Sequence, residues 1–143
     1  MSAPILDELY FYNNEDIYIA GSYAYLATDH RGLFIVDISE PCRPGIISHL
    51  DNLHHAIRVI VDGDHAFVAC GERGLAIVDI KDASSPELLA FLDTPGNCSG
   101  IFVKDDITYL ADSEEGFHIV DISELRRPKI ISTFNMPKGT PDD

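Results

Sequence analysis

The sequence contains no tryptophan, two methionines and three cysteines, and it has few basic side chains. The cysteines, Cys42, Cys70 and Cys98, are odd in number and lack CxxC spacing, so we predict neither a disulfide framework nor a zinc knuckle. Such cysteines favour a reducing compartment. No run approaches the roughly 18 apolar residues of a membrane helix. Residues 1–4 lack the pattern of a signal peptide, which favours the cytoplasm, or export if a leader has been removed.

The chain has 24 acidic side chains and only 10 basic ones, which gives it a net charge of −14. This charge repels phosphate backbones and argues against nucleic acids or anionic membranes as partners. Cations or basic surfaces are the better expectation. The sequence also lacks a glycine-rich phosphate loop, a Gly-x-Ser-x-Gly elbow and a His-Glu-x-x-His motif, and we expect no cofactor.

One seven-residue stretch occurs three times at a regular interval. Gly-Leu-Phe-Ile-Val-Asp-Ile begins at residue 32, and related stretches begin at residues 74 and 116, each 42 residues further on. A period of this length is typical of proteins in which each repeat is one supersecondary unit. The chain is therefore expected to be a repeat protein.

Each repeat divides into four short apolar runs separated by turn residues. Two-residue turns follow the first run, and a proline precedes the fourth, as at the start of an edge strand. We predict four strands per repeat at residues 17–20, 23–28, 32–38 and 45–50; 57–61, 65–70, 74–80 and 87–92; and 101–104, 107–112, 116–122 and 129–134.

The third run is apolar at successive positions, which indicates a strand covered on both faces. Tandem four-stranded sheets covered on both faces are propeller blades. The predicted fold is an all-β propeller with three antiparallel blades. The expected divisions are residues 1–14 as an extra strand or cap, blades at 15–56, 57–98 and 99–136, and a polar tail at 137–143.

Propellers have four to eight blades, so three leave two apolar faces open. We expect a homodimer of two half-rings with six blades, in which the third blade of each chain packs on the first blade of the other. The alternatives are another assembly or a fragment of a longer propeller.

The three stretches, each preceded by Ala-Tyr-Leu-Ala or a relative of it, resemble the LVIVD repeat family of β-propeller proteins. The likeness covers residues 15–136. It implies the propeller fold, in bacterial and archaeal proteins that are often exported or surface-associated and mostly lack an assigned activity. It supplies no catalytic residue. The signature of WD-type propellers is absent, since the chain has no tryptophan.

One aspartate recurs near the end of the third run in every repeat. A carboxylate there must be hydrogen-bonded or exposed, because its burial alone would cost several kcal/mol. We interpret these residues as structural caps for the following turn: Asp37, Asp79 and Asp121.

Function on a propeller is carried by loops, which vary while the blades stay fixed. The loops after the second run and the links between blades fall on one side of the ring, which we call the loop-bearing face. Its candidate ligand or partner residues are Asp29, His30, Arg31, His54, His55, Glu72, Arg73, Asn97, Cys98, Glu114 and Glu115.

Two functions fit this face. The first is a non-enzymatic module that binds a protein or peptide. The alternative is a small-ligand or metal site, with or without catalysis, at the channel mouth formed by both chains. The candidate metal ligands are His54, His55, Cys98 and His30, although no spacing enforces that set.

Overall fold

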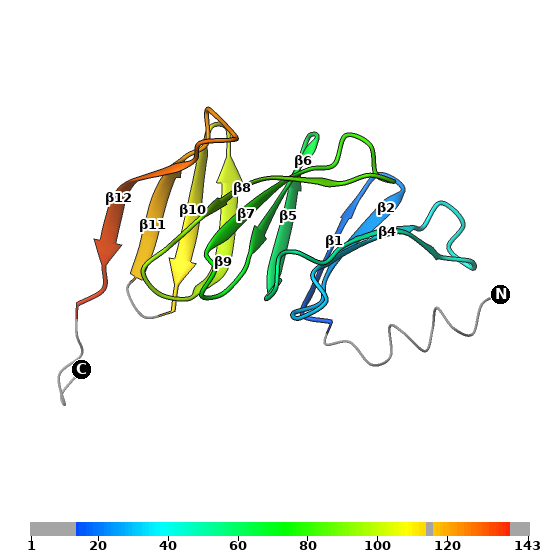
Figure 1. Ribbon diagram of the computed structural model, residues 1–143, viewed down its shortest axis with the longest axis horizontal. Coiled ribbons are helices and arrows are strands. Elements are labelled where there is room, and N and C mark those ends of the chain that lie inside the picture. The colour runs from blue at the N-terminus through cyan, green and yellow to red at the C-terminus, as the bar shows by residue number, and fades with distance from the viewer. Residues whose placement is uncertain (1–13, 114–115, 138–143) are drawn as a thin grey trace.

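Three four-stranded antiparallel sheets stand side by side in the computed structural model, which describes residues 14–113 and 116–137 (Figure 1). All but one residue of the predicted cap, and most of the predicted tail, lie outside these ranges. Across the described ranges there is no helix, and hence none that could cross a membrane.

The strands follow one another in sequence order within each sheet. The first sheet contains β1 (Asp16–Ala20), β2 (Tyr23–Ala27), β3 (Leu33–Asp37) and β4 (Gly45–Leu50). The second contains β5 (Arg58–Asp62), β6 (His65–Ala69), β7 (Leu75–Asp79) and β8 (Glu87–Leu92). The third contains β9 (Cys98–Lys104), β10 (Ile107–Asp112), β11 (Gly116–Asp121) and β12 (Lys129–Asn135). The predicted all-β fold with three four-stranded blades is confirmed.

The first hairpin of each sheet closes over the two-residue turn predicted from the sequence. Ala20 pairs with Tyr23, and the matching pairs in the other sheets are Asp62 with His65 and Lys104 with Ile107. The first turn residue has a positive φ in each case, 60° at Gly21, 61° at Gly63 and 57° at Asp105. Glycine and aspartate tolerate this left-handed conformation better than most residues do.

The start of β9 differs from the expected boundary. The sequence places the strand at residues 101–104, whereas β9 begins at Cys98. Its register shifts between Ala111 and Asp112, so that Cys98 pairs with Asp112 across a bulge. The bulge lets three more residues join the ladder, which a period-two pattern of apolar residues does not reveal.

Two apolar cores fill the spaces between the sheets. Side chains of β2 and β3, such as Tyr25 and Leu33, pack on Val68 and Val78 of the second sheet. The opposite side of β6 and β7 packs on the third sheet. Its core residues are Phe67, Ala69, Leu75 and Ile77, which meet Leu110 and Val120. The second sheet is therefore covered on both faces, as expected for the middle of a stack.

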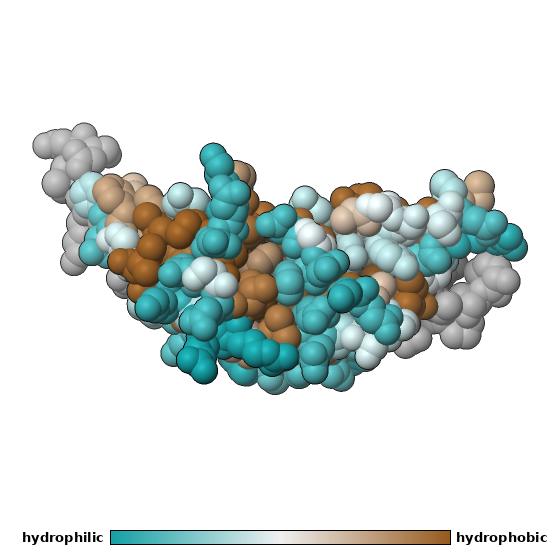
Figure 2. All heavy atoms as spheres, turned by 90° about the horizontal axis from the view of Figure 1, so that it is seen from above, coloured by the Kyte–Doolittle hydropathy of each residue, from teal (hydrophilic) through white to brown (hydrophobic). Residues whose placement is uncertain are grey.

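The two outermost faces carry exposed apolar side chains. In the first sheet these are Ile17 and Ile19 of β1; in the third they include Phe102, Tyr109 and Phe134. Apolar side chains gather at the end of the molecule formed by β9–β12, on the left of Figure 2. We call these surfaces the first-sheet end face and the third-sheet end face.

Candidate functional site

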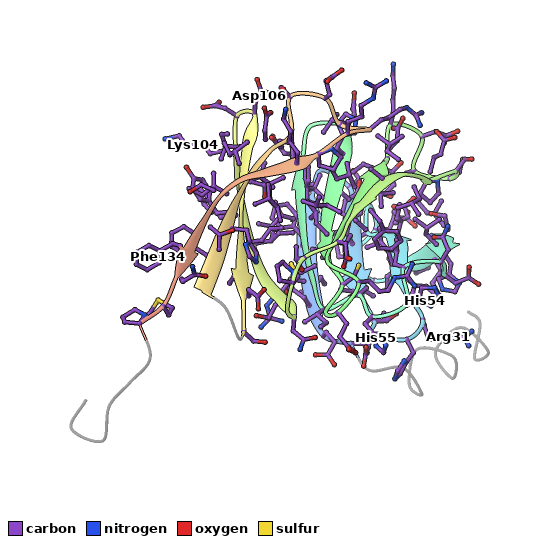
Figure 3. The ribbon with its side chains drawn as sticks, turned by 60° about the vertical axis from the view of Figure 1, so that its left-hand side comes forward. Arg31, His54, His55, Lys104, Asp106 and Phe134 are labelled. Carbon is purple, nitrogen blue, oxygen red and sulfur yellow. The ribbon has the colours of Figure 1, made fainter. Side chains whose placement is uncertain are left out.

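The loop-bearing face is assembled from the β2–β3 and β6–β7 loops and from the links between sheets. Figure 3 places Arg31, His54 and His55 at this edge of the sheets, and Lys104 and Asp106 at the opposite edge. Two predicted members of the face, Glu114 and Glu115, lie outside the described residues.

Two backbone bridges tie the loops of this face to the links between sheets. The Asp29 N–H donates to the Ala56 carbonyl over 2.8 Å, and the Ala56 N–H donates back over 3.0 Å. Gly71 and Cys98 exchange the same pair of bonds at 3.0 and 2.9 Å. The two loops therefore share one backbone arrangement, and their differences lie in the side chains.

Three predicted residues meet at the first bridge. Asp29 and His30 lie in the β2–β3 loop, and His55 lies in the link to the second sheet. His55 Nδ1 is 3.0 Å from Asp29 Oδ1, and His30 Nε2 is 3.9 Å from Asp29 Oδ2. The ligand atoms of all three residues lie within 4.8 Å of one another. This set of two imidazoles and a carboxylate has the chemistry of a transition-metal site.

Cys98, a second candidate ligand from the sequence, does not join this cluster. It begins β9 and is buried in the core between the second and third sheets, so its predicted place in an exposed loop is wrong. Burial, with a smaller contribution from the nearby Asp112 carboxylate, raises the pKa of its thiol to about 12. A thiol of this kind is protonated at neutral pH and is a poor ligand and nucleophile. His54 is exposed and does not belong to the three-residue set.

The remaining candidates are spread along the face. The Arg73 guanidinium lies over the Phe91 ring, 4.8 Å from its centroid. The Arg31 carbonyl accepts a hydrogen bond from His49 Nε2, and the Asn97 N–H donates to Asp112 Oδ1 over 3.2 Å. Glu72 and Arg31 are exposed. Among the described candidates, the structure therefore brings the ligand atoms of Asp29, His30 and His55 together.

The recurring aspartates each hold the turn that follows their strand. Oδ1 of Asp37, Asp79 and Asp121 accepts the N–H of the residue two positions later, at 2.8, 2.9 and 2.8 Å. Hydrogen bonds from Ser39 lower the pKa of Asp37, and bonds from Ser123 do the same for Asp121. The same geometry in all three repeats supports a structural role for them.

The third sheet contains a buried polar network that is not among the residues predicted from the sequence. His118 Nε2 is 3.0 Å from Asp112 Oδ2, and His118 Nδ1 is 2.9 Å from Thr133 Oγ1. Asp112 also accepts the backbone N–H of Gly96 and of Asn97. The sequence contains a signal for this network, because Asp112 and His118 occupy the positions that hold Cys70 and Ala76 in the second repeat. A carboxylate and an imidazole that replace two small core residues together indicate a partnered pair.

Two surface hollows lie away from the Asp29 cluster. One, of about 370 Å³, borders the first-sheet end face at residues 14–17 and Leu26. The other, of about 180 Å³, lies near the β9–β10 turn, where Asp62, His65 and Asp106 contribute to its walls. Neither hollow joins the candidate residues of the loop-bearing face.

A family model described as "LVIVD repeat" matches residues 13–51, 54–94 and 95–136. No curated protein matches the chain.

Similar solved structures include the computationally designed Ika8 protein, with a TM-score of 0.68 over 85% of this chain and 36% of that one, at 7% identity. The designed Ika4 protein gives a TM-score of 0.70 over 87% of this chain and 73% of that one, also at 7% identity. The N-terminal domain of Nup159 gives a TM-score of 0.53 over 85% of this chain and 30% of that one, at 12% identity. The chain thus spans about a third of the first of these structures. At such identities the likeness shows the fold alone.

Proposed function

The chain belongs to the LVIVD repeat family of β-propeller proteins, and from this premise we propose that it is a non-enzymatic module that binds a protein or peptide partner. In this proposal a second copy completes the propeller, and the loop-bearing face of the ring holds the partner. The observation that carries the proposal is the pair of end faces, which are the two halves of one recurring sheet-to-sheet contact.

The contact between neighbouring sheets repeats along the chain. One half is an aromatic residue, an alanine and two aliphatic residues: Tyr25, Ala27, Leu33 and Ile35 in the first sheet and Phe67, Ala69, Leu75 and Ile77 in the second. The equivalent positions in the third sheet, 42 residues further on, form its end face: Tyr109, Ala111, Phe117 and Ile119.

The residues of the other half of the contact also recur at equivalent positions in each repeat. Val59 and Val61 of β5 pack against the first sheet, and Ile101 and Val103 of β9 pack against the second. The equivalent residues of the first sheet are Ile17 and Ile19, on its end face. The two end faces therefore carry complementary halves of the contact, and a second copy supplies the missing half to each.

Exposure at equivalent positions indicates what the missing contact would bury. Val59 is 2% exposed, whereas Ile17 is 56% exposed. Tyr25 and Phe67 are 4% and 2% exposed, whereas Tyr109 is 38% exposed. Burying a large apolar side chain contributes roughly 1.5–3 kcal/mol, so joining the end faces is favourable. Propellers have four to eight blades, and six is the one multiple of three in that range, so two copies of this three-bladed chain suit a closed ring.

The loop-bearing face suits a macromolecular partner better than catalysis. Cys70 and Cys98 are both buried, and the pKa of each thiol is raised to about 12, chiefly by burial. The hollows described above lie elsewhere on the surface. The loops differ from repeat to repeat while the four-stranded architecture of the blades stays the same, as expected where recognition occurs.

Size-exclusion chromatography with light scattering tests the ring. We expect twice the chain mass for the 143-residue protein. Tyr109→Glu on one end face, or Ile17→Glu on the other, should each give a monomer, because a charge would be buried in the joint. Ser22→Glu in the exposed β1–β2 turn adds the same charge away from both faces and should leave the dimer intact. Circular dichroism checks that each variant folds.

Mixing the two monomeric variants makes the test specific for a head-to-tail joint. When one chain of each variant associates, one possible joint contains both substituted faces. The other joint contains two unaltered faces, so the mixture should recover a species of twice the chain mass. A monomeric parent protein at all concentrations, or a dimer that both end-face variants leave unchanged, would rule out the proposed ring.

A further inference from the structure

We propose that Asp29, His30 and His55 form a binding site for one Zn²⁺ ion at the loop-bearing face. The site is assembled from residues 26 positions apart, because His55 lies next to Ala56, whose backbone is bridged to Asp29. The paired N–H and C=O groups hold the two segments together before any ion binds. The proposal does not depend on the partner-binding function proposed above.

The donor atoms already converge. Asp29 directs Oδ1 to His55 and Oδ2 to His30, at 3.0 and 3.9 Å. The two imidazole rings meet edge to face, with centroids 4.8 Å apart and planes at 64°. Bonds to zinc of about 2.1 Å in a tetrahedron place donor atoms roughly 3.4 Å apart. Small rotations of side chains would therefore close the site.

The exposure of the ligands permits this closure. The side chain of His30 is 71% exposed and that of His55 is 43% exposed, so both are able to turn without disturbing a core. Three protein ligands leave a fourth position open at the surface of the protein. The net charge of −14 adds a general attraction for cations.

Asp29 occupies a position that does not need a carboxylate for the fold. Its φ is 58°, and Gly71, its equivalent in the second bridged loop, has a φ of 59°. Aspartate is one of the few residues with a side chain that tolerate this left-handed conformation, and glycine adopts it with no steric penalty. The loop therefore forms with glycine, and the Asp29 carboxylate is an addition to it that faces two histidines.

Zinc is the ion that fits this donor set best. Two imidazoles and one carboxylate with an open fourth position are a common ligand set for zinc. Hard ions such as Mg²⁺ prefer oxygen ligands and near-octahedral geometry, so they should bind far more weakly. Other first-row ions with nitrogen and oxygen preferences, such as Ni²⁺, compete for the same site.

Isothermal titration of untagged protein with ZnCl₂ tests the inference, with MgCl₂ as the comparison ion. Every sample carries Cys42→Ser, so that this exposed thiol does not contribute zinc binding of its own. We expect one Zn²⁺ per chain and no comparable binding of Mg²⁺. His30→Ala and His55→Ala should each weaken the binding of zinc by at least tenfold, since each removes a ligand.

Asp29→Gly is the decisive variant, because glycine is the residue that the equivalent loop already uses. It should fold at least as stably as the parent, so a lost site cannot be attributed to misfolding. His54→Asn is the matched control, since His54 is the neighbouring histidine, has a φ of 69° and lies outside the cluster. It should bind zinc as the parent does. Undetectable zinc binding by the parent, full binding by Asp29→Gly, or equal loss in His54→Asn would overturn the site.

Discussion

At the scale of single residues, burial determines the chemistry of the thiols. Burial raises the pKa of Cys70 to about 12, with a smaller contribution from the neighbouring Cys98. An unfolded thiol has a pKa of about 8.5. Both folded thiols therefore stay protonated as the pH rises from about 8.5 towards 12, while the unfolded chain loses those protons. The free energy of unfolding consequently falls across this window, and the stabilisation is fully present below it.

We predict that alkylation of the native protein is selective for one cysteine. At pH 8, iodoacetamide should modify the exposed Cys42, whereas Cys70 and Cys98 should react only as fast as the protein opens. Mass spectrometry of peptides at successive times measures this. Denaturation in urea is the control, since all three should then react alike. Rapid modification of native Cys98 would contradict the burial described for it.

At the scale of the strand, a close backbone contact explains why the first residue of the repeated stretch is glycine. Gly74 precedes β7 with a φ of 90°, and a Cβ there would lie 2.0 Å from the Leu92 carbonyl oxygen. Gly32 and Gly116 meet the carbonyls of Leu50 and Phe134 in the same way. The fourth strand of each sheet therefore approaches this glycine so closely that no side chain fits.

We predict that Gly74→Ala destabilises the protein far more than Gly63→Ala. Both glycines have positive φ, but a Cβ at Gly63 would meet nothing within 4 Å. Gly63→Ala should cost roughly 1–2 kcal/mol for its backbone conformation. Gly74→Ala should cost roughly a further 1–3 kcal/mol, because the β8 backbone must move.

The midpoints of urea denaturation, compared at equal m-values, measure both variants. Equal losses of stability at the two positions would show that the Leu92 carbonyl does not determine the choice of glycine.

At the scale of the whole molecule, the stacked sheets separate three kinds of surface. The end faces are apolar, the loop-bearing face holds the Asp29 cluster, and the opposite edge carries the tight turns with Lys104 and Asp106 (Figure 3). In a closed ring the end faces would be covered, and the two edges would remain for partners. Because the loops vary and the chain is acidic, we expect a basic partner at the loop-bearing face.

Panning a peptide library against the purified protein tests this expectation. Enriched peptides should carry net positive charge and bind more weakly as salt increases. Glu72→Lys on the loop-bearing face should reduce their affinity by roughly tenfold, which corresponds to about 1.4 kcal/mol. Asp106→Lys makes the same charge change at the opposite edge and should have little effect. Greater weakening by Asp106→Lys would assign partner binding to the opposite edge.

The sequence alone determined the blades, because strand formation and hairpin closure depend on local patterns. Short apolar runs, two-residue turns and the prolines before β4, β8 and β12 occur in one repeat and recur in the two others. The family resemblance rests on the same residues, and the matched family model confirms it. The position of Cys98 was the exception, since the bulge in β9 depends on pairing between strands.

Only the tertiary structure decided which side chains act together. The sequence supplied Asp29, His30 and His55 in a wider set with His54 and Cys98, and neighbouring histidines are not distinguishable by spacing. The bridge between Asp29 and Ala56 selects His55, and the packing of the third sheet withdraws Cys98 into a core. Local patterns fix each strand, but contacts between residues far apart in the chain arise only when the sheets pack.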